Sequence, residues 1–513
     1  MRRWAGVERR GLVTVDGRAK ARAAAVTLMA LAVITACTTT DTPAPATPAP
    51  AGPSEAFVSG TIAWKDCGDG FQCGTLDVPV DYAAPSGEKI PLSLIKLPAT
   101  GTKKGSLLTN PGGPGGSGVN FVRMSGRTFG ESLRRDFDLI GFDPRGVGAS
   151  EPVQCLTDAQ LDTYLKTDMS PDSDAELQKL EKVSKGFAEG CEEHSADLLA
   201  HVGTKDAARD MDAIRAAVGD EKLTYYGASY GTYLGAWYAE QFPQNVRALV
   251  LDGALDPSLT AAETNIQQAK GFETALRAFT EDCVKQPDCP LGTDVDAGMK
   301  KITQLLEKAD KQALKNTSDT RKVEQSLVTW GLATPLYQRE AWPMLRIALA
   351  QAMKGDGTSL LRFADLLVER EQNGTFSNQT ESNMAVNCVD KPNPDVAGFQ
   401  AEADTAAAAA PNFGEFIVWN TLPCAYWPVK SAEEPRALRA AGSAPILVVG
   451  TTRDPATPYQ WAKNLASQLE NGHLLTYDGD GHTAYLSGPP CIRNAIDTYL
   501  TAGTLPPENT TCT

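Results

Sequence analysis

The ten residues Leu223-Thr-Tyr-Tyr-Gly-Ala-Ser-Tyr-Gly-Thr232 decide how this chain folds. β-Prone residues come first, then the pattern G-x-S-x-G centred on Ser229, then an apolar run typical of a helix. A serine between a strand and a helix must adopt a strained backbone so that its hydroxyl stands clear of the sheet. Gly227 and Gly231 are needed because the strand and the helix pass too close for a side chain. The stretch therefore predicts a nucleophilic serine on a sharp turn.

The partners that a serine nucleophile requires follow later in the chain. A serine hydroxyl needs an adjacent base, usually a histidine held in its tautomer by a buried carboxylate. Asp454 comes directly after an apolar strand-like run, and His482 comes after the last such run. The order Ser229, Asp454, His482 is that of an α/β-hydrolase.

Each of these assignments has an alternative. A lone G-x-S-x-G also occurs by chance in surface loops, Asp454 is placed to cap the turn into Pro455, and His482 could be an ordinary loop histidine. Asp478 and Asp480 are alternative carboxylates, although their closeness to His482 in sequence favours a loop role. The other histidines are weaker candidates, because they open a strand or lie in a polar helical region: His473, His194 and His201.

A glycine-rich loop predicts the oxyanion hole, which needs two N–H donors aimed at the developing charge. One donor should be the residue after the nucleophile, Tyr230. The other should come from the loop that begins at Asn110, which is dense in glycine and proline and can bring bare backbone N–H groups to a ligand. We expect Gly113 to supply it, with Gly112 as the second choice; a flexible linker is the alternative reading of this loop.

The amino-terminal segment is typical of export. Residues 1–36 carry seven basic and two acidic residues and end in an apolar run too short to cross a membrane comfortably. The run leads into Val-Ile-Thr-Ala-Cys37, which resembles a bacterial lipobox. We therefore expect 1–36 to be a signal peptide and Cys37 to be lipidated, with a plain secretory signal as the alternative. Residues 37–54 form a Thr/Pro/Ala linker that would tether an exported cell-envelope or secreted protein.

Charge and cysteine content restrict the partners. The formal net charge of −15 argues against nucleic acid, because phosphate binding needs a basic face. Without Cys37, ten of the eleven cysteines remain, and an even number in an exported chain indicates disulfides rather than free thiols. Neither C-x-x-C nor a His/Cys cluster with zinc spacing is present, so we expect no metal and no cofactor. The sequence does not fix connectivity; the simplest pairing is sequential: Cys67–Cys73, Cys155–Cys191, Cys283–Cys289, Cys388–Cys424 and Cys491–Cys512.

The organisation of the chain favours an α/β fold with an insertion. At 513 residues the chain is too long for one compact core. Segments 57–64, 74–80 and 90–97 alternate in polarity and predict an antiparallel meander at a sheet edge. Later strand-like runs are almost wholly apolar, as central parallel strands are. We predict a mostly parallel central sheet in 55–256 and 441–513, interrupted by a large helical cap in 257–440; residues 155–201 also read as helical.

Four motifs together resemble those of the prolyl-iminopeptidase type of serine aminopeptidase: Asn110-Pro-Gly-Gly-Pro-Gly-Gly-Ser-Gly118, Phe142-Asp-Pro-Arg-Gly-Val-Gly-Ala-Ser150, Tyr226-Gly-Ala-Ser-Tyr-Gly231 and Asp480-Gly-His482. The cysteines, Ala385-Val-Asn-Cys-Val-Asp390 and the carboxyl-terminal region resemble secreted bacterial tripeptidyl aminopeptidases in particular. The resemblance covers nearly everything from Ala63 onward. It implies an α/β-hydrolase that removes short peptides, with tripeptides as the expected length, from free amino termini.

An aminopeptidase must also bind the substrate ammonium, so acidic residues should line the pocket under the cap. Asp390 is the candidate, with an ordinary surface carboxylate as the alternative. A carboxylic-ester hydrolase remains the second hypothesis, because a catalytic triad does not distinguish oxygen from nitrogen leaving groups. A non-catalytic binding protein is the third, and the presence of all three triad residues argues against it. Oligomeric state is not indicated.

Overall fold

The computed structural model describes residues 60–431 and 433–513. The signal peptide, the lipidation site and the linker that we expect at 1–36, Cys37 and 37–54 all lie outside the described residues. Among the residues that are described, no helix is both long enough and apolar enough to cross a membrane.

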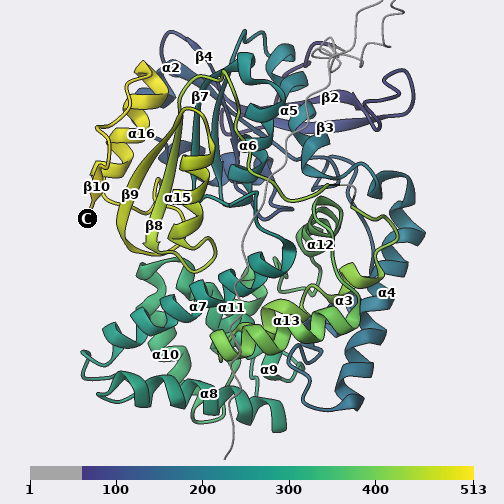
Figure 1. The fold of residues 1–513 in the computed structure, drawn as a ribbon, viewed down its shortest axis with the longest axis vertical. Helices are drawn as coiled ribbons and strands as arrows, with labels where there is room; N and C mark the ends of the chain where they lie inside the picture. The colour runs from purple at the N-terminus through teal and green to yellow at the C-terminus, as the bar shows by residue number, and fades with distance from the viewer. Residues whose placement is uncertain (1–59, 432) are drawn as a thin grey trace, which may run out of the picture. The chain divides into compact units, whose positions relative to one another are not determined.

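A sheet of ten strands, in the order β1-β2-β3-β5-β4-β6-β7-β8-β9-β10, forms the centre of the fold (Figure 1). Strands β1, β2, β3 and β5 pair antiparallel, and all later neighbours pair parallel. This is the mostly parallel α/β-hydrolase sheet that the sequence predicts. The strands are β1 Lys65–Asp66, β2 Gln72–Pro79, β3 Lys89–Leu97, β4 Gly105–Asn110, β5 Phe137–Phe142, β6 Leu223–Ala228, β7 Val246–Asp252, β8 Ile446–Arg453, β9 Gly472–Asp480 and β10 Thr511–Cys512.

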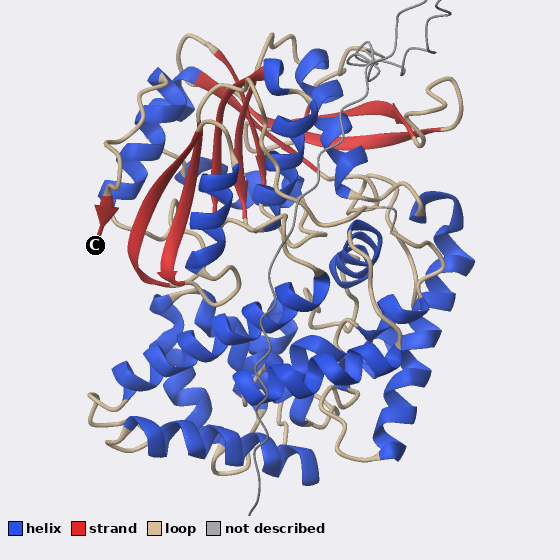
Figure 2. Cartoon of the chain, viewed as in Figure 1, coloured by secondary structure: helices blue, strands red, loops and turns tan. Residues whose placement is uncertain are grey.

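Both faces of the sheet are apolar, and helices cover each of them (Figure 2). Successive side chains of a strand point to opposite faces, so Leu249 and Leu251 of β7 join one core while Ala248 and Val250 join the other. The first core includes α5 Thr204–Ala217, α6 Tyr230–Gln241 and α15 Tyr459–Gln468. The second includes α1 Gly118–Ser125, α2 Glu131–Asp136 and α16 Pro490–Ala502. Short 3-10 turns lie at η1 Gly126–Thr128 and η2 Pro243–Asn245.

Between β7 and β8 the described chain forms the helical cap. Its helices are α7 Ala261–Cys283, α8 Val295–Lys311, α9 Gln325–Ala333, η3 Thr334–Tyr337, η4 Arg339–Ala341, α10 Trp342–Ala352, α11 Thr358–Leu367, α12 Gln379–Asp390, α13 Val396–Ala409, α14 Gly414–Trp419 and η5 Leu422–Tyr426. Helices α7 to α11 enclose a hydrophobic core of their own. Two helices inserted between β5 and β6, α3 Asp158–Lys166 and α4 Asp174–Leu199, pack on α9 and η5. The cap is therefore built from two insertions.

Two edge elements differ from the sequence prediction. No strand forms over 60–64, and the remainder of the strand expected at 57–64 lies outside the described residues; β1 is a two-residue strand instead, in a hairpin closed by Cys67–Cys73. β10, which we did not predict, pairs with β9 and is tied to α16 by Cys491–Cys512. The other disulfides also follow the sequential pairing: Cys155–Cys191, Cys283–Cys289 and Cys388–Cys424.

The loop after β5 ties the sheet to the glycine-rich loop. The Asp143 carboxylate accepts hydrogen bonds from the Ser117 hydroxyl and from the backbone N–H groups of Val119 and Ala149. Arg145 is wholly buried and donates to both carboxylate oxygens of Asp210 at 2.7 Å. A buried carboxylate needs such partners to offset its lost hydration. The motif at 142–150 therefore fixes the loop in which we expect the oxyanion hole.

Candidate active site

Ser229 lies on the turn between β6 and α6 with φ 55° and ψ −126°, a backbone conformation that residues other than glycine rarely adopt. The turn is that tight because β6 and α6 nearly touch: a side chain at Gly227 would begin 2.3 Å from the carbonyl oxygen of Gly231. The Ser229 N–H donates to the Asp252 carbonyl at 2.8 Å, which anchors the turn to β7. The strained serine turn predicted from the sequence is present.

His482 and Asp454 form a buried hydrogen-bonded pair. The imidazole Nδ1 lies 2.9 Å from Asp454 Oδ1 and 3.0 Å from Oδ2, and the two side chains are 8% and 0% exposed. Asp454 also accepts the backbone N–H groups of Ala456 and Thr457, so it caps the turn as well as holding the histidine. A carboxylate at Nδ1 leaves Nε2 as the nitrogen free to act as a base.

The alternative site residues point elsewhere. Asp478 accepts from Thr452 and Arg453, and Asp480 accepts from Arg339 and Arg453, so neither carboxylate holds His482. The other three histidines do not line the cavity that contains Ser229 and His482.

The glycine-rich loop lies directly against the serine turn. Gly112 has φ +100°, and a side chain there would begin 2.6 Å from the carbonyl oxygen of Ala228. The Gly112 N–H donates to the Asn110 side chain at 2.9 Å, so it is not free for a ligand. The backbone N–H groups of Gly113 and Tyr230 have no acceptor among the described residues, and both residues line the cavity beside Ser229. These two N–H groups can receive an oxyanion.

A cavity of about 490 Å³ lies between the sheet and the cap and contains Ser229 and His482. The Ser229 hydroxyl makes no hydrogen bond within the described part of the chain, and serine–histidine contacts of unliganded hydrolases are often longer than a hydrogen bond. Aromatic side chains from the cap line much of the wall: Phe272, Trp330, Phe413 and Phe416. Asp390 is the one carboxylate in the wall among described residues, so the expectation of several lining acids was wrong.

Asp390 ends α12 and lies in the cavity wall. Its carboxylate accepts the Thr204 N–H at 2.8 Å and the Thr204 hydroxyl, which in turn contacts the Tyr230 hydroxyl at 2.6 Å. Burial raises the pKa of Asp390 to about 6, although the hydrogen bonds from Thr204 oppose the shift. The group therefore carries a negative charge at neutral pH within reach of a ligand.

Comparison with known proteins gives relatives along most of the chain. Residues 410–512 match the family described as TAP-like protein. Serine protease Hip1 of Mycobacterium tuberculosis is 40% identical over 456 residues, covering 86% of this chain and 87% of that protein. Tripeptidyl aminopeptidase of Streptomyces lividans is 33% identical over 469 residues, covering 88% and 86%. The chain belongs to this α/β-hydrolase family of serine peptidases. Carboxylesterase B of M. tuberculosis is also similar, at 39% over 451 residues, covering 86% of each chain.

In this member of the family, Asp252 is a second buried carboxylate that supports the site. It ends β7, is wholly buried, and accepts the backbone N–H groups of Ala484 and Tyr485 at 2.9 Å, just after His482. Its backbone carbonyl holds Ser229, so one residue steadies both the serine turn and the histidine loop. We did not predict this role; the only sequence signal was an aspartate at the end of an apolar strand.

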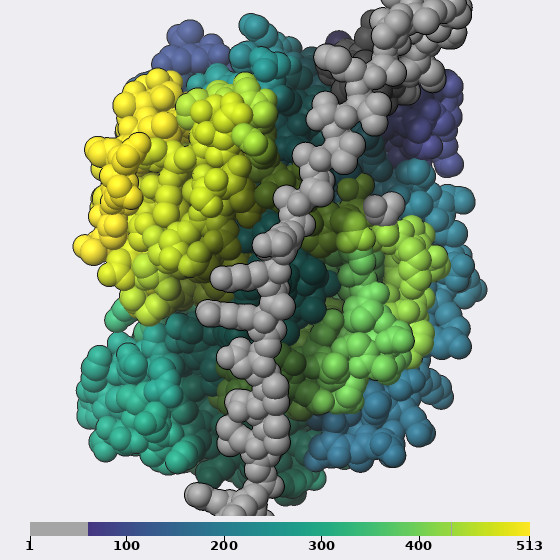
Figure 3. All heavy atoms as spheres, viewed as in Figure 1, coloured from purple at the N-terminus to yellow at the C-terminus, as the bar shows by residue number. Residues whose placement is uncertain are grey.

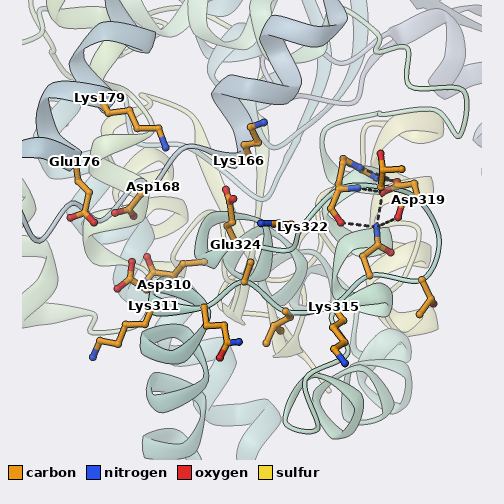
Figure 4. A pocket seen from close by; sticks show the side chains of 18 residues that line it. Lys166, Asp168, Glu176, Lys179, Asp310, Lys311, Lys315, Asp319, Lys322 and Glu324 are labelled. Atoms are coloured by element: carbon orange, nitrogen blue, oxygen red, sulfur yellow. Dashed lines mark hydrogen bonds and ion pairs between the residues drawn. The ribbon is translucent and has the colours of Figure 1, made fainter.

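A second cavity, of about 830 Å³, lies away from these residues (Figure 4). Asp168, Glu176 and Asp310 have carboxylate oxygens within 4.8 Å of one another there, and lysines such as Lys166 and Lys179 stand around them. None of the predicted site residues lines it. An acidic cluster among lysines does not by itself make a site.

The histidine should set the pH dependence of hydrolysis. Burial disfavours imidazolium, but the Asp454 carboxylate outweighs it and raises the pKa of His482 above 6.5. A general base works only when unprotonated, so we expect kcat/KM for a short-chain nitrophenyl ester to fall as the pH drops, with its midpoint above 6.5.

Asp454→Asn should lower kcat for the same ester by about 10⁴-fold, because the carboxylate holds the histidine in the required tautomer and stabilises the imidazolium.

Asp478→Asn is the matched control for this prediction, since Asp478 lies near His482 in sequence but bonds Thr452 and Arg453. It should leave the rate and the pH profile unchanged. A midpoint below 6.5 in the wild type, or an Asp454→Asn variant with wild-type turnover, would contradict the assignment.

Proposed function

We propose that this protein is a serine aminopeptidase that removes short peptides, with tripeptides as the expected length, from free amino termini. The observation that carries the proposal is that one cavity contains Ser229, His482 held by buried Asp454, and two backbone N–H groups that have no acceptor among the described residues. These are the parts that acyl transfer requires. The chain is also similar to serine peptidases along most of its length.

In the proposed mechanism His482 Nε2 takes the Ser229 proton as the hydroxyl attacks the scissile carbonyl. The N–H groups of Tyr230 and Gly113 stabilise the oxyanion, and Asp454 stabilises the imidazolium. His482 then gives its proton to the leaving amine, and the peptide bond breaks to leave an ester on Ser229. Water, deprotonated by the same histidine, hydrolyses that ester and restores the serine.

Asp390 is the proposed partner of the substrate ammonium. A charged hydrogen bond to a carboxylate in a cavity wall is strong and discriminates against a blocked amine. The hydroxyl of Thr204 bonds the Asp390 carboxylate and also contacts the side-chain hydroxyl of Tyr230, whose backbone N–H belongs to the oxyanion hole. Asp390 and Ser229 line the same cavity, so a substrate held at its ammonium group by Asp390 can also reach the serine.

A carboxylic-ester hydrolase is the second candidate. The aromatic lining of the cavity and the 39% identity to carboxylesterase B favour it. An ester substrate needs no ammonium partner, so it would make no use of Asp390.

A comparison of three substrates should separate the two functions. We expect purified protein to cleave a tripeptide anilide with a free amino terminus and to leave the N-acetylated compound intact, because the acetamide cannot pair with a carboxylate. Ser229→Ala should abolish turnover while the fold, measured by circular dichroism, is kept. Hydrolysis of a nitrophenyl ester with neither peptide cleaved would overturn the peptidase proposal, and full activity of Ser229→Ala would remove the nucleophile.

Asp390→Asn should slow the hydrolysis only of substrates that have a free amino terminus. The loss of a charge-assisted hydrogen bond should lower kcat/KM for the free tripeptide anilide by about 10- to 100-fold and leave the ester rate unchanged. Since the carboxylate of Asp390 loses its charge as the pH falls through about 6, the wild-type peptide profile should fall more steeply in acid than the ester profile. The variant should lose that difference.

The matched control is Asp404→Asn, an acid-to-amide change on the exposed side of α13. It should match wild type on both substrates. Equal peptide rates for Asp390→Asn and Asp404→Asn would show that Asp390 does not bind the ammonium.

We also propose that the protein is exported and anchored by a lipid on Cys37, from the lipobox-like sequence described above. Expressed in a bacterium with a lipoprotein pathway, the wild-type chain should partition into detergent and show the mass of a diacylated amino-terminal cysteine. Cys37→Ala should remove both properties. An aqueous wild-type protein that begins after a plain signal-peptidase site would overturn the anchor.

A further inference from the structure

The loop that carries His482 is in contact with the cap as well as with the sheet. It follows β9, and Asp252 and Asp454 hold it from the sheet. From the cap, residues 337–339, at the junction of η3 and η4, also contact it. We propose that this cap segment is a positioning element for the catalytic histidine. The proposal rests on the serine-hydrolase mechanism given above.

The first contact is to the histidine itself. The His482 backbone N–H donates to the Tyr337 carbonyl at 2.8 Å. The Tyr337 ring meets the imidazole edge-on, with centroids 5.3 Å apart and planes at 90°. Gly481 makes this approach possible, because it has φ +107° and a side chain there would begin 2.9 Å from the same carbonyl oxygen. The cap therefore holds both the backbone and the ring of the histidine.

The second contact is ionic and lies two residues earlier. The Asp480 side chain is 5% exposed and pairs with Arg339 of the cap at 2.6 Å, as well as with Arg453 at the end of β8. Arg339 also contacts the rest of the cap, since its guanidinium packs over the Trp342 ring at 5.1 Å and lies 3.4 Å from Asp282. Figure 3 shows the yellow-green part of the chain, which precedes the yellow carboxyl-terminal end, bordering the teal surface of the cap. Asp480 thus joins the cap, the sheet and the histidine loop.

These contacts bear on catalysis because the imidazole serves two atoms in turn. It must reach the Ser229 hydroxyl first and the leaving amine afterwards, and a misplacement of about 1 Å costs about 100-fold in rate. Asp454 fixes only the Nδ1 side of the ring. How far the His482 ring reaches into the cavity depends on the position of the His482 backbone, whose N–H is bonded to the Tyr337 carbonyl. If the cap moved away from this position, the histidine loop would be held only from the sheet, by Asp252 and Asp454.

Arg339→Glu tests the proposal by placing a like charge beside Asp480. We expect kcat to fall about tenfold on both the peptide anilide and the ester, with KM within about twofold, because the histidine serves both reactions. Arg339→Lys keeps the charge and should retain most of the rate. The matched control is Arg277→Glu, because Arg277 is 49% exposed, against 54% for Arg339, and pairs with Asp296 inside the cap at 3.0 Å. It should leave kcat unchanged.

A spectroscopic readout separates positioning from stability. The low-field proton resonance of the His482 Nδ1–Asp454 hydrogen bond should shift or broaden in Arg339→Glu and stay unchanged in Arg339→Lys and Arg277→Glu. Equal kcat values and equal resonances for the two glutamate variants, whatever their melting temperatures, would overturn the proposal. Failure of the underlying mechanism would be seen separately, as turnover by Ser229→Ala.

Discussion

Backbone crowding around Ser229 is the constraint on which the rest of the structure depends. Strand β6, helix α6 and the glycine-rich loop all approach one turn. A side chain in place of Gly227 or Gly112 would begin only 2.3 Å or 2.6 Å, respectively, from a neighbouring carbonyl oxygen. The serine backbone is strained so that its hydroxyl reaches the cavity. The order β4-β6-β7 at the sheet centre follows, because β4 must deliver the glycine loop and β7 the carbonyl of Asp252 to the same point.

Buried carboxylates hold the surrounding loops, and each is satisfied by backbone N–H groups. Asp143 fixes the glycine-rich loop, Asp252 the histidine loop, and Asp454 both its own turn and the imidazole. A carboxylate removed from water is costly unless several donors face it, so these loops are determined as closely as the strands are. The result is a set of dipoles fixed before the substrate arrives, the condition under which electrostatic stabilisation is effective.

Much of this could be predicted from sequence, for physical reasons. Central strands read as apolar runs because both sheet faces are covered, and Ser229, Asp454 and His482 stand at strand ends, where the motif and the chain order mark them. The contribution of α3 and α4 to the cap could not be predicted, since it depends on packing between distant segments. The same holds for Asp252 and Tyr337, whose partners at 484 and 482 are remote in sequence. We did not predict β10 because a strand of two residues is too short to show an alternation of polarity. Residues 60–64 show such an alternation but form no strand.

The position of the cap within the chain has a consequence for biosynthesis. Ser229 is made before the larger cap insertion, between β7 and β8, and Asp454 and His482 are made after it. A nascent chain that has completed β6 and α6 carries a serine with no base, because His482 comes after the whole cap in the sequence. The catalytic triad can therefore assemble only near the end of synthesis.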